Sequence, residues 1–111
     1  MTDLVKRHCE PCEGKTSPLG RDEAQDYMSQ VKEWQLSDDA KSISRDLLCG
    51  NFVAAVEFIN RVKDIAEAEN HHPDLHLTGY KKLRIELSTH AIGGLSENDF
   101  IVAAKINELA A

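Results

Sequence analysis

Hydrophobic and polar residues follow two different periods along this chain of 111 residues. Over residues 52–70, apolar residues recur three or four positions apart, which is the period of a helix with one side turned toward a core. Farther along, apolar and polar residues alternate strictly, which predicts a strand with one buried face. The alternating apolar residues of this strand are Leu83, Ile85 and Leu87. The pattern therefore combines a long central helix with a sheet.

Shorter patterns predict the remaining elements. We expect helices over 20–31 and from about 97 to 109, and strands over 32–36, 41–48 and 75–78. Asn51 is a suitable N-cap for the central helix, and Ser96-Glu97-Asn98-Asp99 resembles a capping box with Asp in place of Glu. The predicted order is αββαββα. The sequence therefore predicts an α+β fold, with a four-stranded antiparallel sheet and its helices packed on one face.

The central helix is apolar over more than one side. Phe52, Val56 and Ile59 mark one side, and Ala55 and Phe58 widen the apolar surface. A helix this broadly apolar should be covered from two directions, by the sheet and by a second subunit. We therefore expect a homodimer or homotetramer. The alternative is that the flanking helices of the same chain cover the helix.

Residues 1–19 read as an irregular N-terminal arm in front of a single domain over 20–111. The arm contains His8-Cys9-Glu10-Pro11-Cys12, a CxxC spacing that occurs in zinc sites and redox pairs. Structural zinc usually needs four ligands, and neither a second CxxC nor an HxxxH follows. Cys49 is too far from this pattern to complete a site. We therefore expect a packed or hydrogen-bonded arm and no metal.

Composition and charge exclude several classes of function. The formal net charge of −6 disfavours non-specific binding to nucleic acid, which needs a basic surface. No apolar run approaches the roughly 20 residues of a membrane span. The first residues have no apolar signal region, so we expect a cytoplasmic protein. The chain has three cysteines, an odd number, and the cytoplasm is reducing, so we expect no disulfides.

The end of the central helix carries the candidate chemistry. Glu67 and His71 are four residues apart, so on a continuing helix they would share one face. Pro73 disfavours a helical residue before it, so His72 should leave the helix and both imidazoles can turn toward one cavity. A third imidazole, His90, follows the alternating strand. Three histidines and a carboxylate suit acid/base catalysis, and a zinc site with three histidines is the alternative.

These residues form a spaced pattern that resembles the signature of the pterin-4a-carbinolamine dehydratase family. The pattern is Glu67-x3-His71-His72-Pro73-x6-Tyr80-x9-His90-x8-Asp99. Ser88-Thr89-His90 with Gly94-Leu95-Ser96 resembles the family's segment between strand and helix, and Trp34 matches its tryptophan. The resemblance covers roughly residues 19–110. Asn70 departs from it, because many members have Asp there, and the lost carboxylate could weaken a neighbouring imidazole.

The resemblance implies dehydration of a 4a-hydroxytetrahydropterin to a quinonoid dihydropterin in pterin cofactor recycling. Water leaves from one position and a proton leaves N5, so the reaction needs an acid and a base but neither a metal nor a redox cofactor. By resemblance, His71 and His90 transfer protons and His72 chiefly binds the substrate. Glu67 would orient His71 or raise its basicity. Which histidine is the acid stays open.

Further residues are expected in the substrate site. By resemblance these are His72, Ser88, Thr89, Trp34 and Asn70. Ser88 and Thr89 would offer hydroxyl or backbone groups to the amide edge of the pterin. Trp34 would flank the pocket, although a lone tryptophan in a small domain commonly belongs to the core. Asp99 has a second reading, as a cap of the last helix.

Two other classes of function stay open. Some members of the family bind a homeodomain transcription factor through the long helix, so a protein-binding coactivator module is the main alternative. A pterin-binding regulator with degraded catalysis is the other, suggested only by Asn70. The substrate would come from a pterin-dependent aromatic amino acid hydroxylase. That enzyme is a possible partner in the same pathway.

Overall fold

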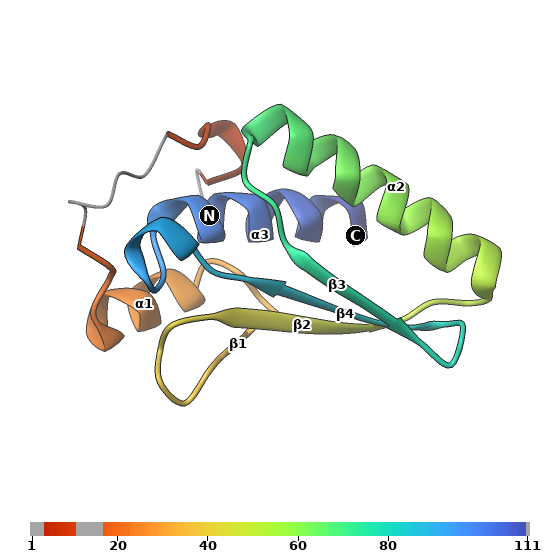
Figure 1. Ribbon diagram of the computed structural model, residues 1–111, viewed down its shortest axis with the longest axis horizontal. Coiled ribbons are helices and arrows are strands. Elements are labelled where there is room, and N and C mark those ends of the chain that lie inside the picture. Colours follow the sequence, from red (N-terminus) through yellow and green to blue (C-terminus); the bar gives the residue numbers. More distant parts are fainter. Residues whose placement is uncertain (1–3, 11–16, 111) are drawn as a thin grey trace.

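Four antiparallel strands form one sheet in the order β1-β2-β4-β3 (Figure 1). The structure is a computed structural model that describes residues 4–10 and 17–110. The strands are β1 (Gln35–Leu36), β2 (Ile43–Leu48), β3 (Asp74–Thr78) and β4 (Lys82–Leu87). The helices are α1 (Arg21–Met28), α2 (Phe52–Glu69) and α3 (Glu97–Ala110), with 3-10 turns η1 (Leu4–Lys6) and η2 (His90–Ile92). The predicted α+β class and the order αββαββα are confirmed.

One face of the sheet forms the core. Leu83, Ile85 and Leu87 of β4 are buried, and the register sets Leu87 opposite Ile43 of β2. Figure 1 shows α2 and α3 on the same side of the sheet. Because side chains alternate along a strand, the polar residues of β4 point to the other face. The predicted packing of the helices on one face is confirmed.

The first predicted strand is much shorter than expected. Strand β1 contains only Gln35 and Leu36, and not the whole of 32–36. Glu33 has a φ of 73°, a left-handed conformation that breaks the extended backbone immediately before Trp34. Trp34 itself packs into the core and is 6% exposed.

Two neighbouring elements also differ from their predicted bounds. Helix α1 ends at Met28 instead of continuing to residue 31. The predicted strand over 41–48 begins at Ile43, because the preceding loop closes on the hydroxyl of Ser37. That hydroxyl accepts hydrogen bonds from the backbone N–H groups of Lys41 and Ser42, at 3.2 and 3.1 Å. Side-chain acceptors of this kind offer the backbone an alternative to strand pairing.

Two asparagines limit the long helix α2. The side chain of Asn51 accepts a hydrogen bond from the Ala54 N–H at 2.8 Å, which confirms the predicted N-cap. Asn70 ends the helix in the left-handed region, with φ 51° and ψ 42°. Asn tolerates this conformation better than most residues. His71 therefore lies beyond the helix, and the prediction that Glu67 and His71 share a helical face is wrong.

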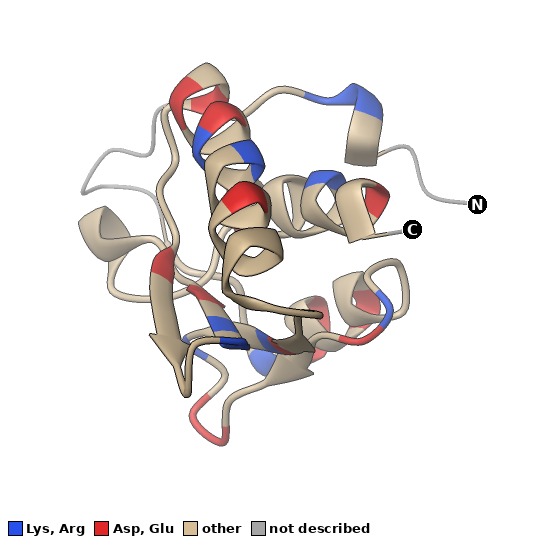
Figure 2. Cartoon of the chain, turned by 90° about the vertical axis from the view of Figure 1, so that its right-hand side faces the viewer, with Lys and Arg blue, Asp and Glu red and all other residues tan. Residues whose placement is uncertain are grey.

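The beginning of α2 is apolar on its outer side. Its first turn contains no acidic residue, and charged residues follow only farther along the helix (Figure 2). Phe52 is 55% exposed and Val53 is 63% exposed. Leu48 at the end of β2 and Tyr80 in the turn between β3 and β4 are exposed as well. The flanking helices of the same chain do not cover these side chains.

Helix α3 is buried along most of its length, including Phe100, Ile101 and Ile106. None of the helices in the described ranges is long and apolar enough to cross a membrane. Cys9 and Cys49 are free thiols. Cys12, the second cysteine of the CxxC spacing, lies outside the described residues.

Candidate active site

Four segments of the chain surround a cavity of about 570 Å³. They are the N-terminal arm, the end of α2 with the residues after it, the end of β4 with η2, and the first turn of α3. The lining residues are Cys9, Glu10, Ala68, Glu69, Asn70, His71, His72, Ser88, Thr89, His90, Ala91 and Asn98. All three predicted histidines therefore meet at one cavity, together with the predicted Asn70, Ser88 and Thr89.

His71 is paired with a buried carboxylate. Its Nε2 lies 2.6 Å from Oδ1 of Asp99, and the Asp99 side chain is completely buried. The imidazole itself is only 12% exposed. A carboxylate at Nε2 accepts the proton of that nitrogen, so Nδ1 is the ring nitrogen with a free lone pair in the neutral form. His71 thus has a fixed tautomer and a neighbour that stabilises its positive charge.

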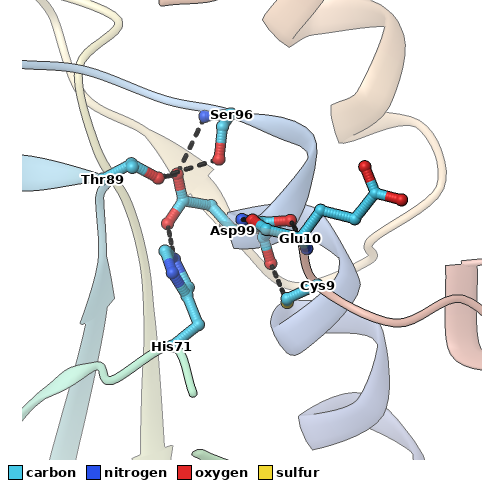
Figure 3. A network of polar contacts seen from close by, with 7 residues as sticks. Cys9, Glu10, His71, Thr89, Ser96 and Asp99 are labelled. Carbon is cyan, nitrogen blue, oxygen red and sulfur yellow. Dashed lines mark hydrogen bonds and ion pairs between the residues drawn. The ribbon is translucent and has the colours of Figure 1, made fainter. Parts of the chain in front are cut away.

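Asp99 is itself fixed by two further donors (Figure 3). Its Oδ2 accepts hydrogen bonds from the hydroxyl of Thr89 at 2.8 Å and from the backbone N–H of Ser96 at 3.0 Å. The second bond is one half of the predicted capping box. Because Thr89 donates to Asp99, the Ser96 hydroxyl, 2.8 Å away, donates to Thr89. Asp99 therefore caps α3 and orients His71 at the same time.

The polar groups of Thr89 face this network and the neighbouring loop, and the side chain is buried. Its N–H donates to the Gly94 carbonyl at 2.8 Å, and its own carbonyl accepts from Ile92 and Gly94. The Thr89 hydroxyl is thus bonded to Asp99 and Ser96, and its predicted contact with the pterin stays a prediction. Thr89 supports Asp99 and, like the half-buried Ser88, lies on the lining of the cavity.

His72 has a carboxylate partner of a different kind. Its Nε2 lies 2.6 Å from Oε2 of Glu67, and both side chains are largely exposed. The sequence predicted that Glu67 would orient His71, and this pairing is wrong. The helix ends before His71, which carries that ring away from Glu67 and toward α3. Glu67 is also absent from the residues that line the cavity.

His90 begins the turn η2 and is exposed at the cavity. Its ring makes no hydrogen bond to another side chain among the described residues. The turn ends at Gly93, which has a φ of 68°, a conformation that a residue with a Cβ rarely adopts. The strand β4 stops at Leu87, so His90 follows the alternating strand, as predicted.

Trp34 does not line the cavity. Its indole N–H donates to Oδ1 of Asn107 at 2.8 Å, and the same oxygen accepts from the guanidinium of Arg45. Asn107 in turn donates to the Lys32 carbonyl at 2.9 Å. The prediction of Trp34 as a substrate-binding residue is therefore wrong within this chain, and its reading as a core residue is the one observed.

Six cavity residues were not predicted, and four of them have side chains other than alanine. Cys9 and Glu10 come from the arm, Glu69 from the last turn of α2 and Asn98 from the first turn of α3. No spacing in the sequence indicated them, because the arm and α3 are about 90 positions apart in the chain. The described residues contain no group of three or more His, Cys, Asp or Glu side chains arranged to hold a metal ion.

The arrangement can move protons at a small molecule. One histidine has a buried carboxylate partner, a second has an exposed one, and a third ring is free of side-chain partners among the described residues. Histidine gains and loses a proton near neutral pH, so these rings can serve as acid and base. A cavity of a few hundred Å³ suits a ligand of the size of a bicyclic heterocycle.

Solved structures support the fold. A crystal structure described as a transcriptional coactivator/pterin dehydratase from Brucella melitensis matches with a TM-score of 0.79 and 27% identity, over 86% of this chain and 100% of that chain. A pterin dehydratase-like protein described as a RuBisCO assembly factor in the alpha-carboxysome matches with a TM-score of 0.60. Its 18% identity shows a shared fold alone.

Sequence comparison identifies the family. A relative from Halorhodospira halophila with the family's name is 46% identical over 108 residues, which cover 97% of this chain and 98% of that protein. Pterin-4-alpha-carbinolamine dehydratase 2, mitochondrial, from Arabidopsis thaliana is also 46% identical. That match covers 98% of this chain and 60% of the longer Arabidopsis protein. The profile of the family described as pterin 4 alpha carbinolamine dehydratase matches residues 17–109. The chain therefore belongs to this family of dehydratases, as the sequence predicted.

Proposed function

We propose that this protein dehydrates a 4a-hydroxytetrahydropterin to the quinonoid dihydropterin by histidine acid/base catalysis. The C4a–O bond breaks and the oxygen leaves as water, while N5 loses its proton. The electron pair of the N5–H bond becomes the new double bond, so no electrons are transferred to another molecule. The observation that carries the proposal is the pairing of His71 Nε2 with Asp99, at 2.6 Å, on a cavity that His72 and His90 also line.

The geometry favours a division of roles between the histidines. Asp99 stabilises positive charge on His71, so His71 is the better acceptor for the N5 proton. His90, at the opposite segment of the lining, protonates the departing hydroxide. His72 contributes to substrate binding, and its exposed partner Glu67 fixes the ring at the rim. Asn70 and Ser88 complete the substrate side of the cavity.

A dehydration assay tests this proposal. Enzymatic turnover of a 4a-hydroxytetrahydropterin is followed by ultraviolet absorbance, with the spontaneous rate subtracted. The variant with both His71→Ala and His90→Ala should lose at least about 10²-fold in kcat, the usual contribution of general acid/base catalysis. Circular dichroism should show an unchanged fold. Near wild-type turnover in this variant would contradict the assignment of both histidines.

The substrate implies an upstream reaction. A 4a-hydroxytetrahydropterin forms when a tetrahydropterin reacts with O₂, one oxygen atom is transferred to an aromatic substrate and the other stays on C4a as the hydroxyl. A pterin-dependent aromatic hydroxylase is therefore the proposed source. The product then needs a reductase to regenerate the tetrahydropterin. We keep the cytoplasm as the predicted location, while the Arabidopsis relative is mitochondrial by its name.

We also propose that the protein is a homo-oligomer. The exposed apolar side chains at the beginning of α2, among them Phe52 and Val53, support a subunit contact there. Burying such a side chain contributes about 1.5–3 kcal/mol. Light scattering at micromolar concentration should give a multiple of the 12.4 kDa chain mass. A monomer would instead favour a different protein as the partner of this end of α2, in line with the coactivator description of the Brucella protein.

A further inference from the structure

The first described part of the N-terminal arm, residues 4–10, is attached to the domain at several points. In residues 4–10, Leu4 is buried against α3, and the Val5 carbonyl accepts a hydrogen bond from Lys105 at 3.1 Å. Arg7 forms an ion pair with Glu97 at 2.7 Å. The arm therefore runs beside α3 toward the end of α2 (Figure 1). It reaches the cavity from the side opposite β4.

Glu69 is the central point of this attachment. It is 8% exposed, and its carboxylate accepts a hydrogen bond from the Cys9 N–H at 2.7 Å. Its other oxygen lies 3.0 Å from His8 Nδ1 and 3.4 Å from Lys105 Nζ. Burial works against the charged form, yet the Cys9 hydrogen bond and the two basic neighbours hold the pKa of Glu69 below its usual value. The last turn of α2 thus binds the arm two residues before His71.

Asn98 makes the second attachment. The backbone N–H of Glu10 donates to its Oδ1 at 3.1 Å, and its Nδ2 donates to the Glu10 carbonyl at 2.6 Å. The Cys9 thiol lies 3.6 Å from the Asn98 carbonyl. Asn98 directly precedes Asp99, and Figure 3 shows Cys9 and Glu10 beside the Asp99 network. The arm therefore contacts the last turn of α2, two residues before His71, and the first turn of α3, which carries Asp99.

We propose that the arm, residues 4–10, is a wall of the pterin cavity that contacts the bound substrate through Cys9 and Glu10 and so positions it. This inference rests on the proposed function. Residues 4–10 precede the part that the family profile matches, which begins at residue 17. The relatives from Halorhodospira and Arabidopsis nevertheless match over 97% and 98% of this chain. The arm is thus an addition to the catalytic domain that places two residues in its site.

The labelling rate of the Cys9 thiol reports whether residues 4–10 are docked at the cavity. Burial, followed by the charges of Glu69 and Asp99, raises the pKa of the Cys9 thiol to about 12. At pH 8 the docked thiol is therefore almost entirely protonated and should react slowly with iodoacetamide, because the thiolate is the nucleophile. Release of the arm lowers the pKa and exposes the sulfur, so labelling should accelerate.

The primary experiment measures protection of Cys9 by a ligand. The wild-type protein is labelled with iodoacetamide with and without a 7,8-dihydropterin, which has no 4a-hydroxyl and cannot be dehydrated, and each cysteine is followed by peptide mass spectrometry. Bound dihydropterin should slow labelling of Cys9 by about fivefold or more, in proportion to occupancy. Cys49 does not line the cavity, so its labelling rate should stay the same. Saturating ligand that leaves Cys9 labelling unchanged would overturn the proposal.

Variants test whether the wall positions the substrate. Glu69→Gln removes the charge that binds Lys105 and His8, so Cys9 labelling should accelerate and KM should rise by about two- to tenfold, the range expected for lost hydrogen bonds. Glu57→Gln, on an exposed part of α2, is the matched control and should change neither. A chain that lacks residues 1–10 should show a larger rise in KM. If that chain does not fold, Glu69→Gln with Asn98→Ala takes its place.

The outcomes separate this inference from the proposed function. Faster Cys9 labelling with unchanged KM and dihydropterin affinity would overturn the inference and leave the dehydratase proposal intact. A wild-type protein that binds dihydropterin with Cys9 protection but does not dehydrate the substrate would overturn the proposed function and support the wall. A protein that binds no pterin would overturn both.

Discussion

His71 and His72 are neighbours in the chain, and each pairs with a carboxylate at 2.6 Å, yet their surroundings differ sharply. The His71 and Asp99 side chains are 12% and 0% exposed, whereas those of His72 and Glu67 are 56% and 70% exposed. An exposed ion pair typically contributes about 0–1 kcal/mol, because water screens it and both side chains must be ordered. A buried carboxylate that loses a partner costs far more. The two pairs therefore have the same distance and differ in burial, and burial is the basis on which we propose His71 and Asp99 as the catalytic pair.

The largest effect is expected for Asp99→Asn. An amide keeps the shape but lacks the charge that stabilises a protonated His71. Its NH₂ group accepts no hydrogen bond, so either His71 or the two donors Thr89 and Ser96 lose their acceptor. We expect kcat to fall by about 10²-fold or more, the scale of a lost proton-transfer step. The measurement is the dehydration rate at saturating substrate. Asp46→Asn, on the outer face of the sheet, is the control and should leave kcat unchanged. If Asp99→Asn keeps the wild-type kcat, the buried carboxylate beside His71 does not contribute to catalysis.

A second prediction concerns the loop that supports the buried pair. A Cβ added at Gly94 would lie 2.7 Å from the Cβ of Pro18, closer than two carbon atoms can approach. Gly94→Ala must therefore shift the loop that binds Thr89 and carries His90, at a cost of about 1–3 kcal/mol. Denaturant unfolding should show that loss, and kcat should fall as well. Gly50→Ala meets no atom within 4 Å and should stay within about 0.5 kcal/mol of wild type. Equal midpoints for the two variants would contradict the close approach to Pro18.

Much of the fold follows from local pattern. The period of α2 and the alternation in β4 are set by residues close together in the chain, so both elements and the antiparallel sheet could be predicted. The errors lie where one backbone conformation overrides the pattern. Glu33 at φ 73° shortened β1, and nothing in the residue type indicates a left-handed glutamate. Such a conformation depends on the packing of Trp34, which is a tertiary effect.

The sequence predicted which histidines line the cavity but not which carboxylate pairs with each of them. The three histidines meet at one cavity as expected, because the helix end and the strand end are both marked in the sequence. The partners were harder to assign. Spacing along a helix favoured Glu67 for His71, but the left-handed Asn70 ends the helix and turns His71 toward Asp99, 28 positions away. A contact over that distance depends on how α2 and α3 pack.

A third prediction concerns Asn70, which separates the two histidines from the helix. Its left-handed conformation costs a residue with an ordinary Cβ about 1–2 kcal/mol, and glycine avoids the cost. Asn70→Ala should therefore lower the free energy of unfolding by about 1–2 kcal/mol, as measured by denaturant midpoint. Asn70→Gly should stay close to wild type. If Ala and Gly behave alike, the left-handed helix end does not constrain the residues after it.

The smallest effect is expected for Glu67→Gln, and it is the sharpest test of the comparison. The replacement removes the charge beside His72, as Asp99→Asn does beside His71, and the paired distance is the same in the two cases. Because the His72 pair is exposed, water replaces much of what is lost, and the amide oxygen can still accept a hydrogen bond from the ring. A pair worth at most about 1 kcal/mol corresponds to a change of about fivefold or less in kcat/KM. Steady-state kinetics of the two variants measure both effects on one scale. A loss in Glu67→Gln as large as that in Asp99→Asn would mean that the exposed pair carries the chemistry, and that burial does not separate the two histidines.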